Sequence, residues 1–367
     1  MIKNKNPYEL DFEEYIRHTD ASKKDKTLAW STAIGLQQVD GLIPSSYLYE
    51  TAKRNIEGDI SFVEVINLID SYYQSRTSRA DNEDERTEEA DKVSSRIAQI
   101  LSEPSFNFSP SFLVAIHKRL FEGIFKFAGK IRDYDITKKE WVLNGDTVMY
   151  GAAYELKAAL DYDFEQEHNF NYKGLSIDET IRHITLFISR LWQIHAFGEG
   201  NTRTTAVFTI KYLRSLGFKA DNDIFAENSW YFRNALVRAN YTNLKKGIQE
   251  NTIYLERFFR NLLLNEHNEL KNRYTHIDYD DHMKKIGNRT EDSQKNLPVN
   301  LSVNLPVNKK QAELLNLLKE NPAYTYDELA EKLKRTRETV RVNLRKLEEL
   351  GLIRRIGADK NGHWEVL

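Results

Sequence analysis

Cysteine is absent from the sequence, which excludes disulfide bonds and thiolate metal sites, so we expect a reducing, cytoplasmic environment. Apolar runs of the roughly 18 residues needed to cross a bilayer are also absent, and no membrane partner is expected. The N-terminal residues 1–7 (MIKNKNP) lack the apolar stretch of a signal peptide. The net charge of −2 argues against a protein that is basic throughout, but a local basic surface is compatible with it.

The chain is long enough for two or three domains, because 367 residues can bury at least one large core. Its 40% hydrophobic and 11% aromatic content is typical of a folded globular protein. Apolar residues recur mainly at helical spacing, which predicts a mainly α protein. We expect four parts: an N-terminal helical segment over residues 1–95, a helical domain over 96–265, a linker over 266–308 and a compact unit over 309–367.

Helix start and stop signals divide the beginning of the chain into three helices. The first helix covers residues 28–39 and is closed by Gly41, the second ends at Gly58, and Ser61 caps the third. Residues 81–91 then contain seven carboxylates. A run of like charge usually forms a solvated helix face or a mobile linker, and we expect one of these here.

The stretch Thr137–Tyr150 has a different pattern. Trp141-Val-Leu143 and Thr147-Val-Met149 are strand formers, and they flank the Asn144-Gly145 pair. Asn-Gly is a frequent two-residue turn between antiparallel strands. The stretch therefore predicts a β-hairpin inside an otherwise helical domain.

The most informative segment is the run His195–Thr204 (HAFGEGNTRT), which lies between two apolar helices. A glycine-containing loop that leads into a helix N-terminus binds anions through backbone N–H groups and the helix dipole. His195 is suited to taking a proton from an attacking hydroxyl, Glu199 to binding Mg²⁺ beside a phosphate, and Arg203 to gripping phosphate oxygens. A lone histidine at the end of an apolar helix is more often a core residue. The ordered set instead predicts a nucleotide-phosphate site with its own base.

The run resembles the signature of the Fic family, HxFx(D/E)GNGRxxR. The matching residues are His195, Phe197, Glu199, Gly200, Asn201 and Arg203. The likeness extends over about residues 97–265, including Gly129–Arg132 and the hairpin that the family calls the flap. It implies a helical enzyme domain that transfers AMP from ATP to a Ser, Thr or Tyr hydroxyl of a target protein. Self-modification, in which the chain is its own target, is one variant of this hypothesis.

The resemblance also implies a role for each site residue. His195 would be the general base and Glu199 the Mg²⁺ ligand. The phosphates would contact Gly198, Gly200, Asn201, Thr202 and Arg203, and the adenine would be bordered by Tyr231 and Asn234. A target segment would add as a strand along the flap, at Thr137, Trp141, Val142, Thr147, Val148 and Met149.

Three positions depart from the family pattern. Ala196 replaces the usual proline, at little expected cost. Thr202 stands where glycine is usual and differs from the lysine of the Doc branch, which phosphorylates, so phosphate transfer is less expected. Ala206 replaces the second arginine and removes a charge-assisted contact of about 1.5–3 kcal/mol on the γ-phosphate side. We therefore expect slower turnover or a different ATP pose.

Many Fic proteins are restrained by a helix carrying (S/T)xxxE(G/N), whose glutamate pairs with that second arginine. The N-terminal segment resembles the antitoxin partners of Fic toxins, and two of its acids compete for this role. Asp40 precedes Gly41 but has Leu36 at the Ser/Thr position, whereas Glu57 precedes Gly58 but has Lys53 there. Of the two, Asp40 is preferred. Because Ala206 replaces the arginine, the restraint is weaker or uses Arg203.

The end of the chain reads as a separate unit. Residues 296–308 (NLPVNLSVNLPVN) contain two prolines and predict an extended linker, and three helices and a β-hairpin follow, which predicts a winged helix. Residues 309–367 contain 13 Lys or Arg and 10 Asp or Glu. The candidate DNA contacts are Arg337, Arg341, Arg345, Arg354 and Arg355. A protein-contact or homodimer module is the open alternative.

The sequence leaves three candidate functions. The first is a protein adenylyltransferase that uses ATP and Mg²⁺ and is restrained by its N-terminal segment. The second is a winged-helix DNA-binding regulator whose Fic domain senses nucleotide with little turnover. The third is removal of AMP, or transfer of another phosphate-containing group, at the same site.

Overall fold

The computed structural model describes residues 21–75, 82–220 and 223–279, together with residues 313–366 except 316, 319–320, 323, 334, 350–352 and 357–362. The chain divides into two compact units, Met1–Ser293 and Gln294–Leu367. Helices dominate both units. In the part of the chain that is described, no helix is both long enough and apolar enough to span a membrane.

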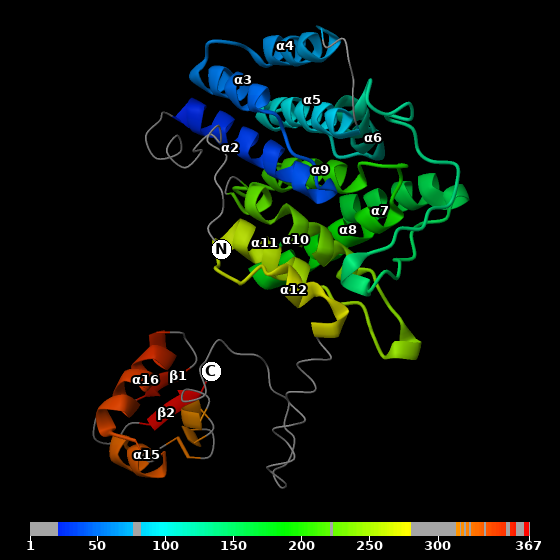
Figure 1. Ribbon diagram of the computed structural model, residues 1–367. Helices are drawn as coiled ribbons and strands as arrows, with labels where there is room; N and C mark the ends of the chain where they lie inside the picture. The colour runs from blue at the N-terminus through cyan, green and yellow to red at the C-terminus, as the bar shows by residue number, and fades with distance from the viewer. Residues whose placement is uncertain are drawn as a thin grey trace. The chain divides into compact units, whose positions relative to one another are not determined.

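The N-terminal helices form one layer of the first unit (Figure 1). They are α2 (Ala21–Gly35), the 3₁₀ turn η1 (Leu36–Asp40), α3 (Ser46–Glu57), α4 (Phe62–Ser75) and α5 (Asn82–Ser102). Gly41 and Gly58 adopt the left-handed conformation that closes η1 and α3, and the Ser45 side chain caps α3 by accepting from the Leu48 N–H. The predicted helix ends are thus confirmed, with the first helix tightening to 3₁₀ at Leu36.

Gly35 fixes where η1 lies. A Cβ at this position would stand 2.3 Å from the carbonyl oxygen of Ala226, so only glycine lets α2 approach α10 (Ile224–Ala239) so closely. The Ser229 hydroxyl donates to the Gly35 carbonyl at 2.7 Å. These contacts hold η1 beside α9 (Asn201–Ser215), against which it packs.

From Asn82 on, the acidic run is not a linker: it forms the first half of α5, and Asp81 lies outside the described residues. Asp91 is fully buried, and its carboxylate accepts from the Tyr73 hydroxyl at 2.6 Å and from Ser45. Burial raises the pKa of Asp91 to about 6. The prediction of a solvated helix face or mobile linker is therefore wrong for this residue, because α3 and α4 cover that side of α5.

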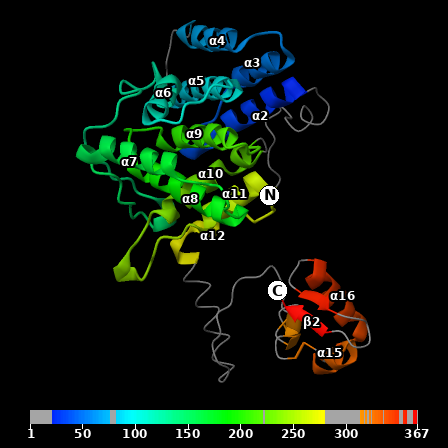
Figure 2. The same ribbon diagram turned by 180° about the vertical axis from the view of Figure 1, so that it is seen from behind.

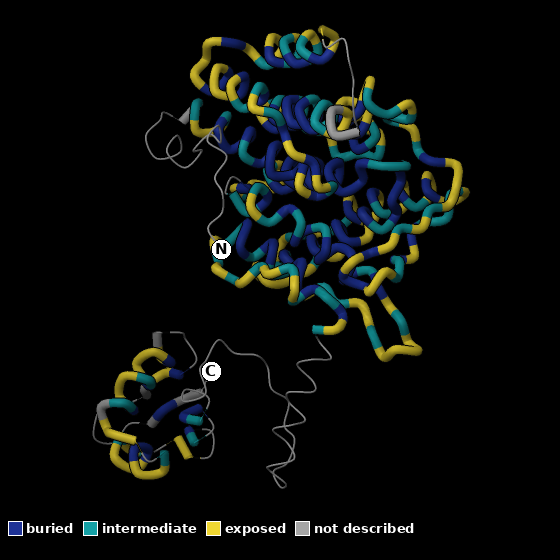
Figure 3. Tube along the Cα trace, in the orientation of Figure 1, coloured by how far each residue is buried: buried dark blue, intermediate teal, exposed yellow. Residues whose placement is uncertain are grey.

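α9 lies between the N-terminal helices and α8, as Figure 1 and the reverse view in Figure 2 show, and the first unit contains further helices. They are α6 (Pro110–Phe121), α7 (Leu156–Asn169), α8 (Ile177–Ile194), α10, α11 (Ile253–Leu264) and α12 (Asn272–Thr275), with short 3₁₀ turns η2 (Trp141–Leu143), η3 (Ala153–Glu155) and η4 (Leu244–Lys246). Every residue of α9 from Asn201 to Leu213 is buried, and Figure 3 shows this core.

The predicted β-hairpin at Thr137–Tyr150 is wrong in its secondary structure. Val142 and Leu143 are consecutive and both fully buried, whereas strand residues alternate between faces, and they lie in η2. Asn144 then closes η2 in the left-handed conformation, and the Glu140 N–H donates to the Asp146 carbonyl at 2.9 Å. The chain still reverses at Asn144-Gly145, but through a 3₁₀ turn.

The second unit contains α15 (Tyr326–Lys332), α16 (Arg337–Glu349) and the antiparallel strands β1 (Ile353–Ile356) and β2 (His363–Val366). Ile353 pairs with Val366. Buried Leu329, Leu344 and Trp364 belong to a core of its own. The last two predicted helices and the hairpin are confirmed; the helix predicted over 309–319 lies partly outside the described residues.

Candidate active site

The loop between α8 and α9 is shaped to receive an anion. His195 ends α8 with φ +51°, and Gly200 precedes α9 with φ +79°. Within the described residues no side chain caps the N-terminus of α9. The Asn201 side chain instead clips the loop, with Nδ2 donating to the Phe197 carbonyl at 2.7 Å and Oδ1 accepting from the Phe197 N–H at 2.9 Å. Asn201 therefore orders the loop with its side chain, which leaves its backbone for a ligand.

Two positions of the loop require glycine, because side chains of other segments approach their backbone closely. A Cβ on Gly200 would stand 2.4 Å from the ring of Phe121, and one on Gly198 would stand 2.5 Å from the Tyr134 hydroxyl. The absence of a Cβ at Gly200 thus lets the backbone adopt a positive φ before α9 and pack directly against the Phe121 ring.

His117 on α6 supports the loop, and sequence reasoning missed it. Its ring stacks on Phe197 with 3.8 Å between centroids. Its Nδ1 accepts from the Gly129 N–H at 2.9 Å, so its Nε2 carries the proton and donates to the Glu199 carbonyl at 3.0 Å. Burial lowers the pKa of His117 to about 4, which keeps the ring neutral. Its signal in the sequence was a histidine on the apolar face of residues 110–121.

His195 is neutral, and one of its two ring nitrogens has no hydrogen-bond partner among the described residues. Its Nδ1 lies 3.3 Å from the Trp192 carbonyl, which only accepts, so Nδ1 carries the proton. Its Nε2 is buried without a hydrogen-bond partner among the residues described. Burial, with the nearby charges of Lys138 and Arg132, holds the pKa of His195 well below its ordinary value. The free lone pair of Nε2 is what a general base needs.

Arg132 holds the His195 carbonyl in place. Its Nε donates to that carbonyl at 2.8 Å, while its other nitrogens donate to the carbonyls of Tyr134 and Gly151 at 2.5 Å each. The side chain is fully buried, so one guanidinium joins the loop between α8 and α9 to the segments on both sides of the flap. It belongs to the Gly129–Arg132 stretch noted from sequence.

The Glu199 carboxylate forms an ion pair with Lys138. The Nζ of Lys138 lies 3.1 Å from both carboxylate oxygens. Burial acts to raise the pKa of Glu199, but Lys138, the Gly200 N–H and Arg203 together lower it below its ordinary value. The carboxylate is therefore ionised, as a Mg²⁺ ligand must be.

Arg203 is fully buried and paired with the N-terminal helices. Its Nε lies 2.8 Å from an oxygen of Asp40, its Nη2 donates to Glu89 at 2.6 Å, and its Nη1 donates to Gln37 at 3.1 Å. The Asp40 contact has the distance of an ion pair but not the angle of a hydrogen bond. The guanidinium also lies 4.9 Å from the centre of the Phe121 ring. Gln37 and Glu89 were missed from sequence.

The other predicted site residues are placed as follows. The Thr202 hydroxyl accepts from the Trp192 indole at 2.9 Å, and Ala206 is fully buried. Tyr231 and Asn234 are buried, where they bond to the Tyr254 carbonyl and to Asn272, and they do not line the cavity beside the loop. Their neighbours on α10 do, because successive helical residues point in different directions.

A cavity of about 770 Å³ lies beside the loop. It is lined by residues 38–42 of and after η1, Arg86 and Glu89 of α5, Phe125, Lys138 and Lys139 before the flap turn, Glu199 and Arg203 of the loop and α9, and Trp230 and Arg233 of α10. Asp40 thus lies at the site. Glu57 does not: it pairs with Lys23 at 2.8 Å, at the far end of α3.

Of the predicted flap contacts, Thr137, Trp141 and Met149 are exposed, and Met149 is 85% exposed. Val142 and Val148 are buried, and the Thr147 hydroxyl is bonded to the Lys138 N–H and the Val148 carbonyl. Thr137, Trp141 and Met149 are therefore the exposed members of the six, and Thr147 is half-buried.

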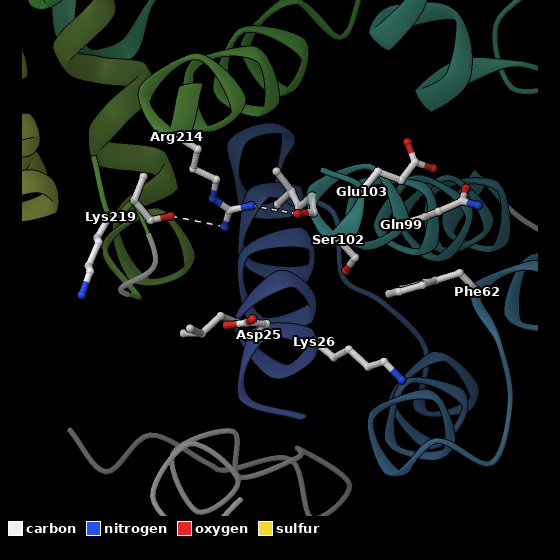
Figure 4. Close-up of a pocket in the computed structure, with 11 residues that line it drawn as sticks. Asp25, Lys26, Phe62, Gln99, Ser102, Glu103, Arg214 and Lys219 are labelled. Atoms are coloured by element: carbon white, nitrogen blue, oxygen red, sulfur yellow. Dashed lines mark hydrogen bonds between the residues drawn. The ribbon is translucent and has the colours of Figure 1, made fainter. Parts of the chain in front are cut away.

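A second cavity of about 760 Å³ shares no lining residue with the first (Figure 4). Two of its cations contact the protein: Arg214 donates to the carbonyls of Leu101 and Ala220, and Lys26 donates to the Asn55 carbonyl. Arg214 thereby caps the C-terminal end of α5, which is a structural role.

In the second unit, Arg337, Arg341 and Arg345 of α16 and Arg354 of β1 are exposed. Arg337 lies 3.4 Å from Asp327. Arg355 lies in β1, and its side chain is outside the described residues.

Residues 107–213 match the Fic/DOC family. The chain contains a Fic/DOC domain. The match covers α6 to α9 and includes the whole loop from His195 to Arg203. Residues 307–354 match a winged helix-turn-helix DNA-binding family, and the C-terminal unit is a winged helix.

Similar proteins are known. Over 119 residues the chain is 28% identical to the protein adenylyltransferase VbhT of Bartonella schoenbuchensis. The aligned region is 32% of this chain and 24% of that protein. A Fic domain with bound ADP from Bartonella quintana is 20% identical, with a TM-score of 0.41 over 52% of this chain and 92% of its own. A Fic family protein from Desulfovibrio desulfuricans is 15% identical, with a TM-score of 0.41 over 97% of this chain and 93% of its own. The domain assignment rests on the family match.

Proposed function

We propose that the chain is a protein adenylyltransferase that moves AMP from ATP to a Ser, Thr or Tyr hydroxyl of a protein. The observation that carries this proposal is the unpartnered, unprotonated Nε2 of His195, in a loop that leads to the uncapped N-terminus of α9. Glu199 and Arg203 line the cavity beside that loop. The Fic/DOC match and the similarity to a named adenylyltransferase support the same reaction class.

The reaction would use these groups in one step. The acceptor oxygen attacks the α-phosphorus of ATP and forms a new P–O bond, while the bond from that phosphorus to the oxygen bridging to the β-phosphate breaks. Pyrophosphate leaves, and the acceptor proton passes to His195 Nε2. The N–H groups of the first turn of α9 lie where they can stabilise charge on the phosphates.

The donor set fits Mg²⁺ bound together with a nucleotide. The described residues include no group of three or more His, Cys, Asp or Glu that would form an all-protein metal cage. Mg²⁺ is commonly held by one or two carboxylates plus substrate phosphates, and Glu199 supplies one ionised carboxylate at the cavity. When bound, the ion would neutralise phosphate charge. Glu199 would hold it next to the α9 N-terminus.

The flap turn would position the acceptor segment. Trp141 and Met149 are large apolar side chains that are 51% and 85% exposed, and they belong to the turn that follows Lys138. Such exposed side chains next to a catalytic loop suit an extended peptide. The target protein would dock here, or a second copy of the chain would present its own hydroxyl.

The N-terminal segment would restrain the enzyme through Arg203. Asp40, Glu89 and Gln37 occupy all three nitrogens of the guanidinium that would otherwise reach the phosphate tail. Ala206 offers no second cation on α9 for a carboxylate to hold. The restraint proposed here therefore acts on Arg203, with Asp40 as the acid that precedes Gly41.

The test uses ATP labelled at either the α- or the γ-phosphate. Full-length protein and an Asp40→Ala variant are incubated with each label, alone and with cell lysate, beside His195→Ala. Transfer of α-label to protein that His195→Ala abolishes is the expected result. Transfer of γ-label only would establish phosphorylation instead, and loss of α-label from a modified protein would establish AMP removal. No transfer by either active form overturns the proposal.

The winged helix supports a second function, binding to duplex DNA. The family match names this activity, and α16 carries Arg337, Arg341 and Arg345 as exposed side chains. A recognition helix of this kind enters the major groove, with strand cations on the backbone. Binding of the full chain to random duplex DNA at increasing salt tests it, and affinity independent of salt contradicts it.

A further inference from the structure

Lys138 and Glu199 form an ion pair that faces the nucleotide cavity. The lysine nitrogen is equidistant from both carboxylate oxygens, at 3.1 Å, and both residues line the 770 Å³ cavity. The side chains are 26% and 43% exposed, so the pair is open to solute on one side. The Lys138 backbone is fixed by its N–H, which donates to the Thr147 hydroxyl at 3.3 Å.

The arginines that line the cavity have partners other than Glu199. Arg203 pairs with Asp40 and Glu89, Arg233 pairs with the buried Glu140 at 2.7 Å, and Arg86 donates to the carbonyls of Asp40 and Gly41. None of those acceptors is the metal-binding carboxylate. Lys138 alone among these cations is held by the group that Mg²⁺ would use.

A metal ion and an ammonium group cannot both sit on one carboxylate without strong repulsion. When Glu199 takes Mg²⁺, Lys138 must therefore leave it. The lysine side chain is long and flexible, and its Nζ starts in the cavity where the phosphate tail would lie. Ala206 supplies no charge on α9, so the tail has a place for a second cation from elsewhere.

We propose that Lys138 neutralises Glu199 until Mg²⁺ arrives and then binds the phosphate tail of ATP, in the role that a second arginine on α9 would have had. This inference rests on the proposed function, because it requires a nucleotide in this cavity. It makes Lys138 both a competitor of the metal and a ligand of the nucleotide.

The two roles of Lys138 predict that its removal changes the affinity for the metal and the affinity for the nucleotide in opposite directions. Removing the Lys138 charge removes the competitor, so the metal alone binds more tightly, by about three- to tenfold. It also removes a charge-assisted contact to the tail, so the magnesium complex of AMPPNP, a non-hydrolysable ATP analogue, binds about tenfold more weakly or worse. A merely structural lysine would weaken both.

The experiment compares wild type with Lys138→Met, Lys138→Arg and Lys139→Met, each also in an Asp40→Ala background that loosens Arg203. Titration calorimetry measures Mn²⁺ alone and Mg²⁺ with AMPPNP, and thermal unfolding checks that each variant is folded. Lys139 is the matched control, because it lines the same cavity and is exposed. We expect opposite shifts for Lys138→Met, nucleotide binding restored in Lys138→Arg, and unchanged Mn²⁺ affinity for Lys139→Met.

Unchanged nucleotide affinity in Lys138→Met, or a parallel loss of both affinities, overturns the role of Lys138. If wild type nevertheless transfers α-label, the proposed function stands without it. If neither background binds AMPPNP, both proposals fall together.

Discussion

The Nε of Arg203 lies 2.8 Å from a carboxylate oxygen of Asp40, which joins helix α9 to the turn that precedes the Fic/DOC domain. Arg86 of α5 donates to the Asp40 and Gly41 carbonyls at 2.9 and 3.1 Å, and Glu89, one turn further along the same helix, is the second acid on Arg203. The proposed restraint therefore involves η1 and α5 together.

Releasing Arg203 should raise activity. We expect Asp40→Ala and Glu89→Ala each to increase the initial rate of α-label transfer about tenfold or more, since a charge-assisted contact to a buried arginine is worth about 1.5–3 kcal/mol. Glu57→Ala is the control, because Glu57 pairs with Lys23 on the surface instead. Equal rates for wild type, Asp40→Ala and Glu89→Ala would show that the N-terminal helices do not restrain the site.

Local signals in the sequence predicted the parts of the fold that are determined locally. Gly41 and Gly58 end helices because their left-handed backbone favours glycine, which is visible in the sequence alone. The flap turn was mispredicted, since β-forming residues in Trp141-Val-Leu143 are also apolar residues that the core buries side by side.

The pairing around Arg203 could not be predicted in full for a different reason. Gln37 and Glu89 are separated from Arg203 by 166 and 114 residues, and nothing local marks either as its partner. Asp40 was found through the Gly that follows it. Glu89 was hidden among six other carboxylates, which made the whole run resemble solvated surface.

His117 should make the protein less stable in acid. Its pKa is about 4 in the folded state and near 6.5 when unfolded, so the unfolded state binds more protons between these values. Its contribution is present above pH 6.5 and is lost as the pH falls toward 4, by about 3 kcal/mol. We expect this loss to be smaller in His117→Gln, measured by urea unfolding across that range. The same acid loss in the variant would assign it to other groups.

Asp91 acts in the opposite sense. Burial raises its folded pKa to about 6 from an ordinary 3.8, so its stabilising effect is greatest below pH 3.8 and is lost as the pH rises through 6. In wild type this offsets much of the His117 effect. Asp91→Asn should therefore lose stability in acid more steeply than wild type, by about 2 kcal/mol between pH 6 and 4. Parallel curves would rule out a raised Asp91 pKa.

Gly200 and Gly174 separate backbone strain from steric overlap. Both have positive φ, +79° and +85°, but only Gly200 would place a Cβ 2.4 Å from another group, the Phe121 ring. Gly174→Ala should cost about 1–2 kcal/mol for its backbone alone. Gly200→Ala should cost clearly more in urea unfolding and should also reduce nucleotide affinity. Similar losses for the two variants would mean that the ring moves freely.

The depressed pKa of His195 predicts an unusual rate profile. Its Nε2 is the proposed base, and burial with nearby cations keeps it unprotonated below the ordinary histidine range. The kcat/KM for ATP, which reports the free enzyme, should therefore stay near its maximum as the pH falls from 8 to about 6. A midpoint near 6.5 would show that the imidazole titrates as it does in water.

The winged helix should bind DNA through counterion release. Arg341 and Arg345 lie four residues apart on α16 and are both exposed, so they share one face of the helix. If each neutralises one phosphate, Arg341→Ala and Arg345→Ala should each lower the slope of log affinity against log salt by about 1. Lys332→Ala, on α15, is the control and should leave the slope unchanged, because Lys332 lies 4.9 Å from the Tyr324 ring centre within the unit. Fluorescence anisotropy of a labelled duplex with the full chain, from 50 to 300 mM salt, measures all three. An unchanged slope in both arginine variants, with DNA still bound, would move the interface away from α16.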